Sequence, residues 1–93
     1  MAAAPRPIRE VRFTSHFARA SARLPLDLRR SAEERLGWFK RNAFDPRLRT
    51  HKLHGSLEGY WSFSLTRRHR VLFRFLRSDA ALLFDVGDHR VYR

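Results

Sequence analysis

Three strand-like runs in the second half of the chain constrain its fold more than any other feature. Residues 61–66 alternate Trp, Phe and Leu with Ser and Thr, residues 71–76 alternate Val and Phe with Leu and Arg, and residues 80–86 are mostly apolar. Alternation predicts β-strands with two unlike faces, and the short connections RRHR and SD predict antiparallel neighbours. We therefore expect a meander that carries polar side chains on the face away from the core. These are Ser62, Ser64 and Arg74.

The first half of the chain changes to a helical period. Residues 8–14 fit a further strand, and residues 15–24 fit a short helix with Thr14 or Ser15 as its N-cap. Within residues 25–44, apolar side chains recur every three or four positions, which predicts one apolar stripe on a second helix. The stripe consists of Leu28, Ala32, Leu36, Phe39 and Ala43.

Together these elements predict an α+β fold, in which a helical hairpin joined at Leu24–Pro25 packs on one face of the sheet. A chain of 93 residues offers room for one hydrophobic core, so we expect a single domain, with residues 1–7 as a flexible N-terminus. The sequence has no cysteine, which excludes disulfides and thiolate catalysis. It has no apolar run near the roughly 18 residues of a membrane span. We expect a cytoplasmic protein that does not bind membranes.

The charge of the chain indicates the kind of partner. Twenty Lys and Arg residues against nine Asp and Glu give a formal net charge of +11, and most of the cations are arginines. The planar guanidinium group matches the geometry of phosphate oxygens, so the composition favours RNA, DNA or an acidic protein as the partner. A solvated basic surface without a specific partner is the alternative.

Histidines mark the candidate chemistry. His51 and His54 lie in HKLHG, before the first run of the meander, and His89 follows the last run, where Gly87 lets the chain turn back over the sheet. Histidine is the side chain best suited to move protons near neutral pH. The spacing of His51 and His54 also fits two metal ligands, but the sequence offers few further ligands, so we expect no metal. Ordinary loop histidines are the alternative.

Metal-free RNA cleavage fits this set of residues. A base deprotonates the ribose 2′-hydroxyl, which attacks the adjacent phosphate, while an acid protonates the departing 5′-oxygen. Cations stabilise the negative charge that grows on the phosphate oxygens, and an aromatic ring such as Tyr60 can stack on a base. Six cations lie near the proposed face or its rim. They are Arg49, Lys52, Arg67, Arg68, Arg70 and Arg74.

Four segments, in this order and spacing, resemble the RelE/ParE superfamily of bacterial toxins and its RelE/YafQ-like branch in particular. The segments are HKLHG, GYWSFSL, HRVLFRF and GDHRVY, and the resemblance covers residues 8–93. It implies two helices against a curved antiparallel sheet. It also implies the toxin of a type II toxin–antitoxin pair, an endoribonuclease that cleaves mRNA in the ribosomal A site without metal or cofactor. A cognate antitoxin, expected to be acidic, would bind and neutralise it.

The resemblance also implies roles for individual residues. His51, His89 and Arg70 match catalytic positions, and the expected substrate-binding residues are Lys52, His54, Arg68, Arg74 and Tyr92. Two positions depart from the YafQ-like pattern, because Ser64 stands in place of a catalytic histidine and Arg68 in place of an acidic residue. These departures leave an alternative open, namely a ParE-like toxin that inhibits DNA gyrase without catalysis.

Overall fold

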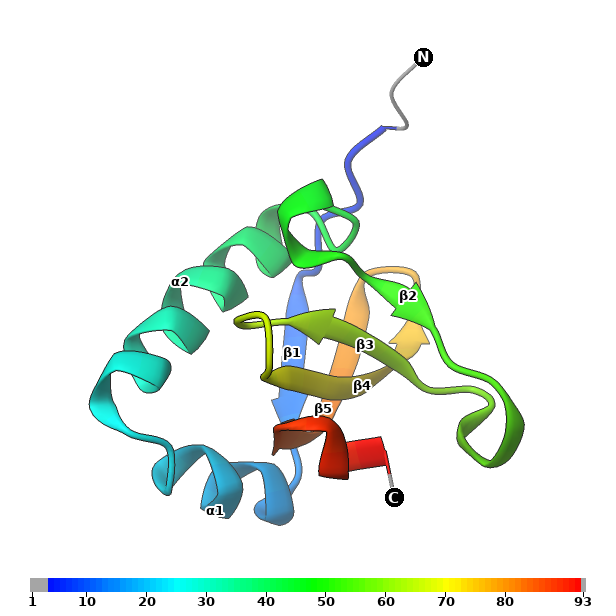
Figure 1. Ribbon diagram of the computed structural model, residues 1–93. Coiled ribbons are helices and arrows are strands. Elements are labelled where there is room, and N and C mark those ends of the chain that lie inside the picture. The colour runs from blue at the N-terminus through cyan, green and yellow to red at the C-terminus, as the bar shows by residue number, and fades with distance from the viewer. Residues whose placement is uncertain (1–3, 93) are drawn as a thin grey trace.

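The computed structural model of the protein describes residues 4–92. Within these residues the chain forms five strands, two α-helices and three short 3-10 helices (Figure 1). The order is β1 (Glu10–Phe13), α1 (Ser15–Ala22), α2 (Leu26–Arg41), η1 (Pro46–Leu48), β2 (His51–Lys52), η2 (Gly55–Leu57), β3 (Trp61–Ser64), β4 (Arg70–Arg77), β5 (Ala80–Gly87) and η3 (His89–Tyr92). None of the helices in this part of the chain is both long and apolar enough to cross a membrane.

The five strands form one mixed sheet in the order β1-β5-β4-β3-β2. The predicted meander is confirmed, because β3, β4 and β5 pair antiparallel in succession. The sheet differs from the prediction in two ways. The two-residue strand β2 adds to the free edge of β3, and β1 pairs with β5 in parallel, so the sheet is not purely antiparallel. The α+β class holds, with both helices on one side of the sheet (Figure 1).

Aromatic rings fill the space between α2 and the sheet. The Phe39 ring is fully buried and lies with its centroid 4.8 Å from that of Phe63 and 5.0 Å from that of Phe73. The alternation predicted this arrangement, since Phe63 and Phe73 belong to the apolar face of β3 and β4. Trp61, on the same face, is half-buried and packs edge-on against Phe75.

The helix boundaries follow from local hydrogen bonds. Thr14 caps α1, because its hydroxyl accepts a hydrogen bond from the backbone N–H of Phe17 at 3.0 Å. Helix α2 ends at Arg41, two residues before Ala43, the last member of the predicted apolar stripe, and Ala43 is nevertheless fully buried. The two helices are joined near Pro25 as predicted, but they diverge in an open V (Figure 1) and do not form a side-by-side hairpin.

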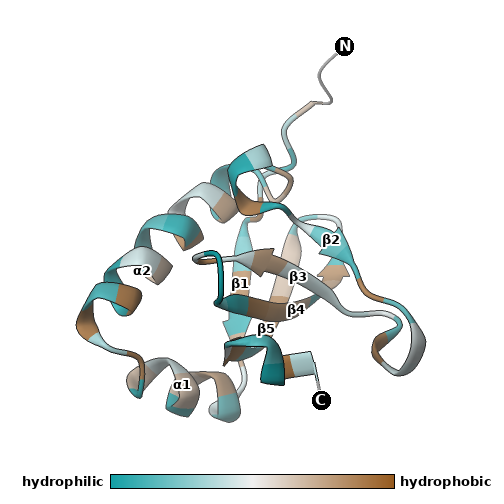
Figure 2. Cartoon of the chain, in the orientation of Figure 1, coloured by the Kyte–Doolittle hydropathy of each residue, from teal (hydrophilic) through white to brown (hydrophobic). Residues whose placement is uncertain are grey.

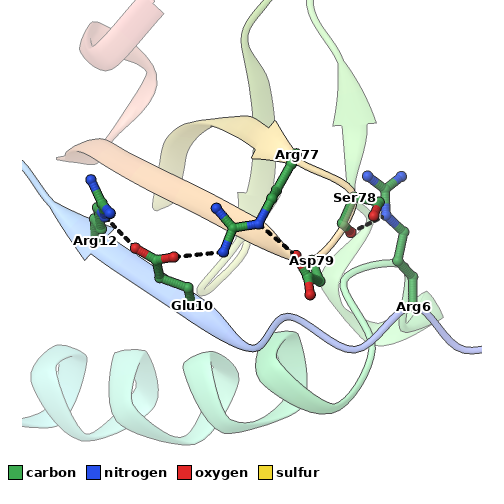
Figure 3. A network of polar contacts seen from close by, with 6 residues as sticks. All are labelled: Arg6, Glu10, Arg12, Arg77, Ser78 and Asp79. Atoms are coloured by element: carbon green, nitrogen blue, oxygen red, sulfur yellow. Dashed lines mark hydrogen bonds and ion pairs between the residues drawn. The ribbon is translucent and has the colours of Figure 1, made fainter.

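Arg6, in the segment before β1, bonds to the turn between β4 and β5 and to the residue after α2. The Arg6 guanidinium group donates to the carbonyl oxygen of Ser78 at 2.7 Å (Figure 3) and lies 4.2 Å from the centroid of the Phe75 ring. Its backbone N–H also bonds to the side chain of Asn42. Residues 1–3 of the segment that we expected to be flexible lie outside the described residues.

An ion-pair network ties β1 to the turn between β4 and β5 (Figure 3). The Glu10 carboxylate accepts from Arg12 and, at 2.7 Å, from Arg77, which also pairs with Asp79 at 3.0 Å. The hydrogen bonds from these two guanidinium groups hold the pKa of Glu10 below its ordinary value. The network therefore links the start of β1, the single parallel strand among the described residues, to the end of β4 and the turn that follows it.

Candidate active site

The sheet face away from the helices carries the candidate chemistry, and we call it the open face. Strand pairing places Ser62 opposite Leu72 and Ser64 opposite Arg70. His51 is the partner of Ser62 across β2 and β3. Since paired residues point to the same side of a sheet, all five side chains share one face. The predicted polar face therefore exists, and β2 adds a histidine to it.

The last turn of the chain folds over this face. The hydroxyls of Tyr92 and Ser62 are 2.8 Å apart, and Ser62 is completely buried, although we expected it to be open to solvent. Gly87 lies close under η3, since a Cβ at this position would be 3.2 Å from the side chain of Val91, a tight contact. Glycine therefore gives η3 more room than a larger residue would. Element η3 also carries His89, which is exposed.

His51 is held in one tautomer by the backbone before it. Its Nδ1 lies 2.9 Å from the carbonyl oxygen of Arg49. A carbonyl oxygen only accepts, so Nδ1 carries the proton, and Nε2 of the neutral ring is left as a free acceptor. Arg49 has a φ of 51°, the left-handed conformation that arginine rarely adopts. Such strain is often found at functional positions.

Arg70 is the half-buried cation of the open face. Its guanidinium group donates to the hydroxyl of Ser64, its partner across β3 and β4. Ser64 is the position at which the resemblance implies a histidine. Here its hydroxyl orients a guanidinium group, so the position supports Arg70 and does not supply a proton carrier of its own.

The structure separates the residues expected to bind substrate. Lys52 follows His51 on a strand and therefore points to the opposite side of the sheet, where its ammonium group lies 5.7 Å from the centroid of the Trp61 ring. Arg74 is on the open face, with its guanidinium carbon 5.9 Å from the centroid of the Tyr60 ring. It lies four residues beyond Arg70, about 13 Å along the strand. Its guanidinium group faces Tyr60, whereas that of Arg70 bonds to Ser64, so the two cations have different partners.

The remaining expected substrate-binding residues occupy exposed loops. His54 immediately precedes η2, and Arg68 lies in the turn between β3 and β4. The backbone N–H of Arg68 bonds to the hydroxyl of Thr66 at 3.2 Å, which fixes the turn and leaves the guanidinium group in solvent. Neither side chain is brought to Tyr92 by a described contact.

The structure brings together a group of arginines of which sequence analysis named only three, Arg49, Arg67 and Arg70. Five arginines line a cavity of about 210 Å³ beside the open face, at the hydrophilic turn between β3 and β4 (Figure 2). They are Arg35, Arg47, Arg49, Arg67 and Arg70, and we call this cavity the arginine pocket. Arg35 lies on α2 and Arg47 on η1. No pattern in the sequence indicates that these two segments lie next to the turn between β3 and β4.

A second hollow, of about 430 Å³, is lined in part by Leu72 of the open face and Val91 of η3. Tyr60 and Phe84 line it with their rings packed edge to face at 5.0 Å. His16 of α1 lines it as well, and its Nε2 lies 3.0 Å from the Asp85 carboxylate.

One wall of the arginine pocket gives a pH prediction. Arg47 donates two side-chain hydrogen bonds to the Asp45 carboxylate and lowers its pKa from 3.8 to about 2. Because the pKa is lower in the folded state, this pair stabilises the fold above about pH 4, and the contribution is lost as the pH falls towards 2. NMR titration should give Asp45 a pKa near 2 and a clearly higher value in Arg47→Gln. An unchanged pKa in that variant would contradict the pairing.

Comparisons with known proteins agree on the fold. No family model matches the sequence, and no curated protein is significantly similar to it. Among solved structures, the toxin–antitoxin complex RelBE2 from Mycobacterium tuberculosis contains a similar chain, with a TM-score of 0.73, 22% identity and coverage of 89% of this chain and 93% of that one.

Two further structures extend the likeness. YafQ from Escherichia coli superimposes with a TM-score of 0.70 at 13% identity, over 90% of this chain and 97% of its own. The YoeB–YefM complex from Staphylococcus aureus gives a TM-score of 0.70 at 18% identity, over 86% of this chain and 95% of that one. At these identities the comparison establishes architecture only. The chain therefore has the fold of the RelE, YoeB and YafQ toxins of toxin–antitoxin systems.

Proposed function

We propose that this protein is the toxin of a type II toxin–antitoxin pair and cleaves mRNA on the ribosome without a metal ion. The hydrogen bond between Tyr92 and Ser62 is the observation that carries the proposal. It holds η3 against β3 beside His51, the partner of Ser62, while Arg70 lies opposite Ser64, two residues further along β3. His51, Arg70 and Tyr92 share this face, and the adjoining η3 carries His89. Together they could supply the acid, the base and the cation that metal-free RNA cleavage uses.

In the proposed reaction, Nε2 of His51 takes the proton of the ribose 2′-hydroxyl. The resulting 2′-oxygen attacks the phosphorus atom, the bond to the 5′-oxygen breaks, and His89 gives that oxygen a proton. Arg70 stabilises the charge on the phosphate oxygens, and its bond to Ser64 holds it ready for that contact. The products are a 2′,3′-cyclic phosphate and a 5′-hydroxyl, so no water molecule enters this step.

A cognate antitoxin belongs to the same proposal. RelBE2 and YoeB–YefM are complexes of a toxin with its antitoxin. The formal net charge of +11 favours an acidic partner for this chain. Such a partner would also compete with RNA for the same cations.

The test is mRNA cleavage in a bacterial translation extract, with cut sites mapped by primer extension. Wild-type protein should produce discrete cuts, and folded His89→Ala should produce none or far fewer. Normal cutting by the variant would contradict the role of His89. Intact message with the wild-type protein, together with inhibition of DNA gyrase supercoiling, would replace the nuclease by a gyrase inhibitor.

A further inference from the structure

We propose that Arg49 and Arg67 of the arginine pocket bind one backbone phosphate of the substrate RNA strand, next to the phosphate that Arg70 holds where the pocket meets the open face. This inference rests on the proposed function, which it extends by a second binding position. Arg70 is the one predicted site residue that lines the pocket; Lys52, His54, Arg68, Arg74 and Tyr92 do not line it.

Charge is the first argument. Two of the five arginines are neutralised, since Arg35 pairs with Glu34 at 2.6 Å and Arg47 with Asp45 at 2.7 Å. The other three have no carboxylate within ion-pair distance among residues 4–92. These are Arg49, Arg67 and Arg70. Three like charges around one small cavity repel one another, and an anion in the cavity would remove that repulsion.

The rigidity of the walls is the second argument. The ring of Trp38 carries two guanidinium groups, with the Arg47 carbon 3.8 Å and the Arg35 carbon 4.8 Å from its centroid. On the opposite wall, the Thr66 hydroxyl accepts from the backbone N–H groups of Arg68 and His69 and so fixes the turn that carries Arg67. Donors held in place before binding lose less entropy when they meet a phosphate.

Continuity with the open face is the third argument. Ser64 and Arg70 line the pocket and also belong to the open face. Arg49 lines the pocket as well, and its carbonyl oxygen holds His51. One RNA strand that passes His51 and Arg70 would therefore reach the pocket with its next phosphate. Arg49 has a left-handed backbone conformation, which glycine would adopt without strain. An arginine at such a position is consistent with a functional role for its side chain.

The experiment measures binding separately from cleavage. The probe is a short single-stranded RNA with 2′-O-methyl groups, which lacks the attacking hydroxyl, and its affinity is determined at several salt concentrations. Loss of one phosphate contact should reduce the slope of log K against log salt by about 0.7. We expect that reduction in Arg67→Gln and in Arg49→Gln. Arg19→Gln on α1 removes the same charge from an exposed arginine elsewhere and should keep the wild-type slope.

The outcomes separate this inference from the proposed function. Unchanged slopes in both pocket variants, with wild-type protein that cuts message, would overturn the pocket and leave the nuclease in place. Reduced slopes with a wild-type protein that never cuts would support the pocket and overturn the nuclease. Binding to ribosomes without mRNA is the second arm. If the variants weaken only that binding, the phosphate belongs to ribosomal RNA, and the assignment to the substrate strand is wrong.

Discussion

His51→Ala is expected to slow RNA cleavage by a factor of about 10² to 10⁴, the usual contribution of a general base. The bond from Nδ1 to the Arg49 carbonyl fixes the tautomer that leaves Nε2 unprotonated, and alanine supplies no acceptor there. Since His51 is exposed, the free energy of unfolding should change by only about 0.5 kcal/mol or less. Primer-extension assays at equal protein concentration, with urea unfolding curves, measure the two quantities.

The matched control for His51 is His16→Gln. His16 is also exposed and also bonded, to Asp85 at 3.0 Å, but it lies on α1. This variant should cut as fast as wild type. Cleavage at the wild-type rate by His51→Ala would show that another group takes the proton, and it would remove the central element of the proposed mechanism.

Phe39→Ala is expected to lower the free energy of unfolding by about 3–5 kcal/mol, the range for removing a buried phenylalanine ring. Its side chain has no solvent exposure and packs against the rings of both Phe63 and Phe73. The vacated space is enclosed by α2 and the sheet, which cannot collapse without moving whole elements. Urea or thermal unfolding monitored by circular dichroism gives the value, and a domain of this size has little stability in reserve.

Leu26→Ala provides the comparison on the same helix. Leu26 is the first residue of α2 and is 54% exposed, so its truncation should change the free energy of unfolding by about 0.5 kcal/mol or less. A similar loss in both variants would mean that the destabilisation reflects helix α2 as a whole. A loss below about 1 kcal/mol in Phe39→Ala would mean that the ring is not the centre of the core.

The elements with a long periodic signal could be predicted from the sequence. The alternation from Trp61 onwards identified β3 and β4, and the apolar stripe through Phe39 identified α2, because these patterns reflect burial directly. Strand β2 has two residues, too few to show a period, and exists because it pairs with β3. The parallel pairing of β1 joins segments distant in the sequence, and no local pattern encodes it.

For the candidate site, the sequence indicated residues but only part of their arrangement. His51, Arg70 and Tyr92 were proposed from the resemblance, and strand register together with the Tyr92–Ser62 bond brings them to one face. Lys52 could not be placed correctly, because β2 was not predicted. Only the strand shows that Lys52 points to the face opposite His51. The arginine pocket could not be seen either, since Arg35 lies on α2 and reaches the pocket only through tertiary packing.

The parallel pair of strands also has a consequence for how the chain folds. Glu10 pairs with Ala80 and Phe13 with Leu83, residues that are 70 positions apart (80 − 10), so this pairing closes a loop of most of the chain. Contacts of such high sequence separation carry a large entropic cost before they contribute any stability. We expect folding in the millisecond-to-second range typical of high contact order, with the β3–β4–β5 meander formed first and β1 docking last. Until β1 docks, β5 has an unpaired edge. Chains in that partly folded state should be the most prone to aggregate, since an open strand edge can pair with another chain.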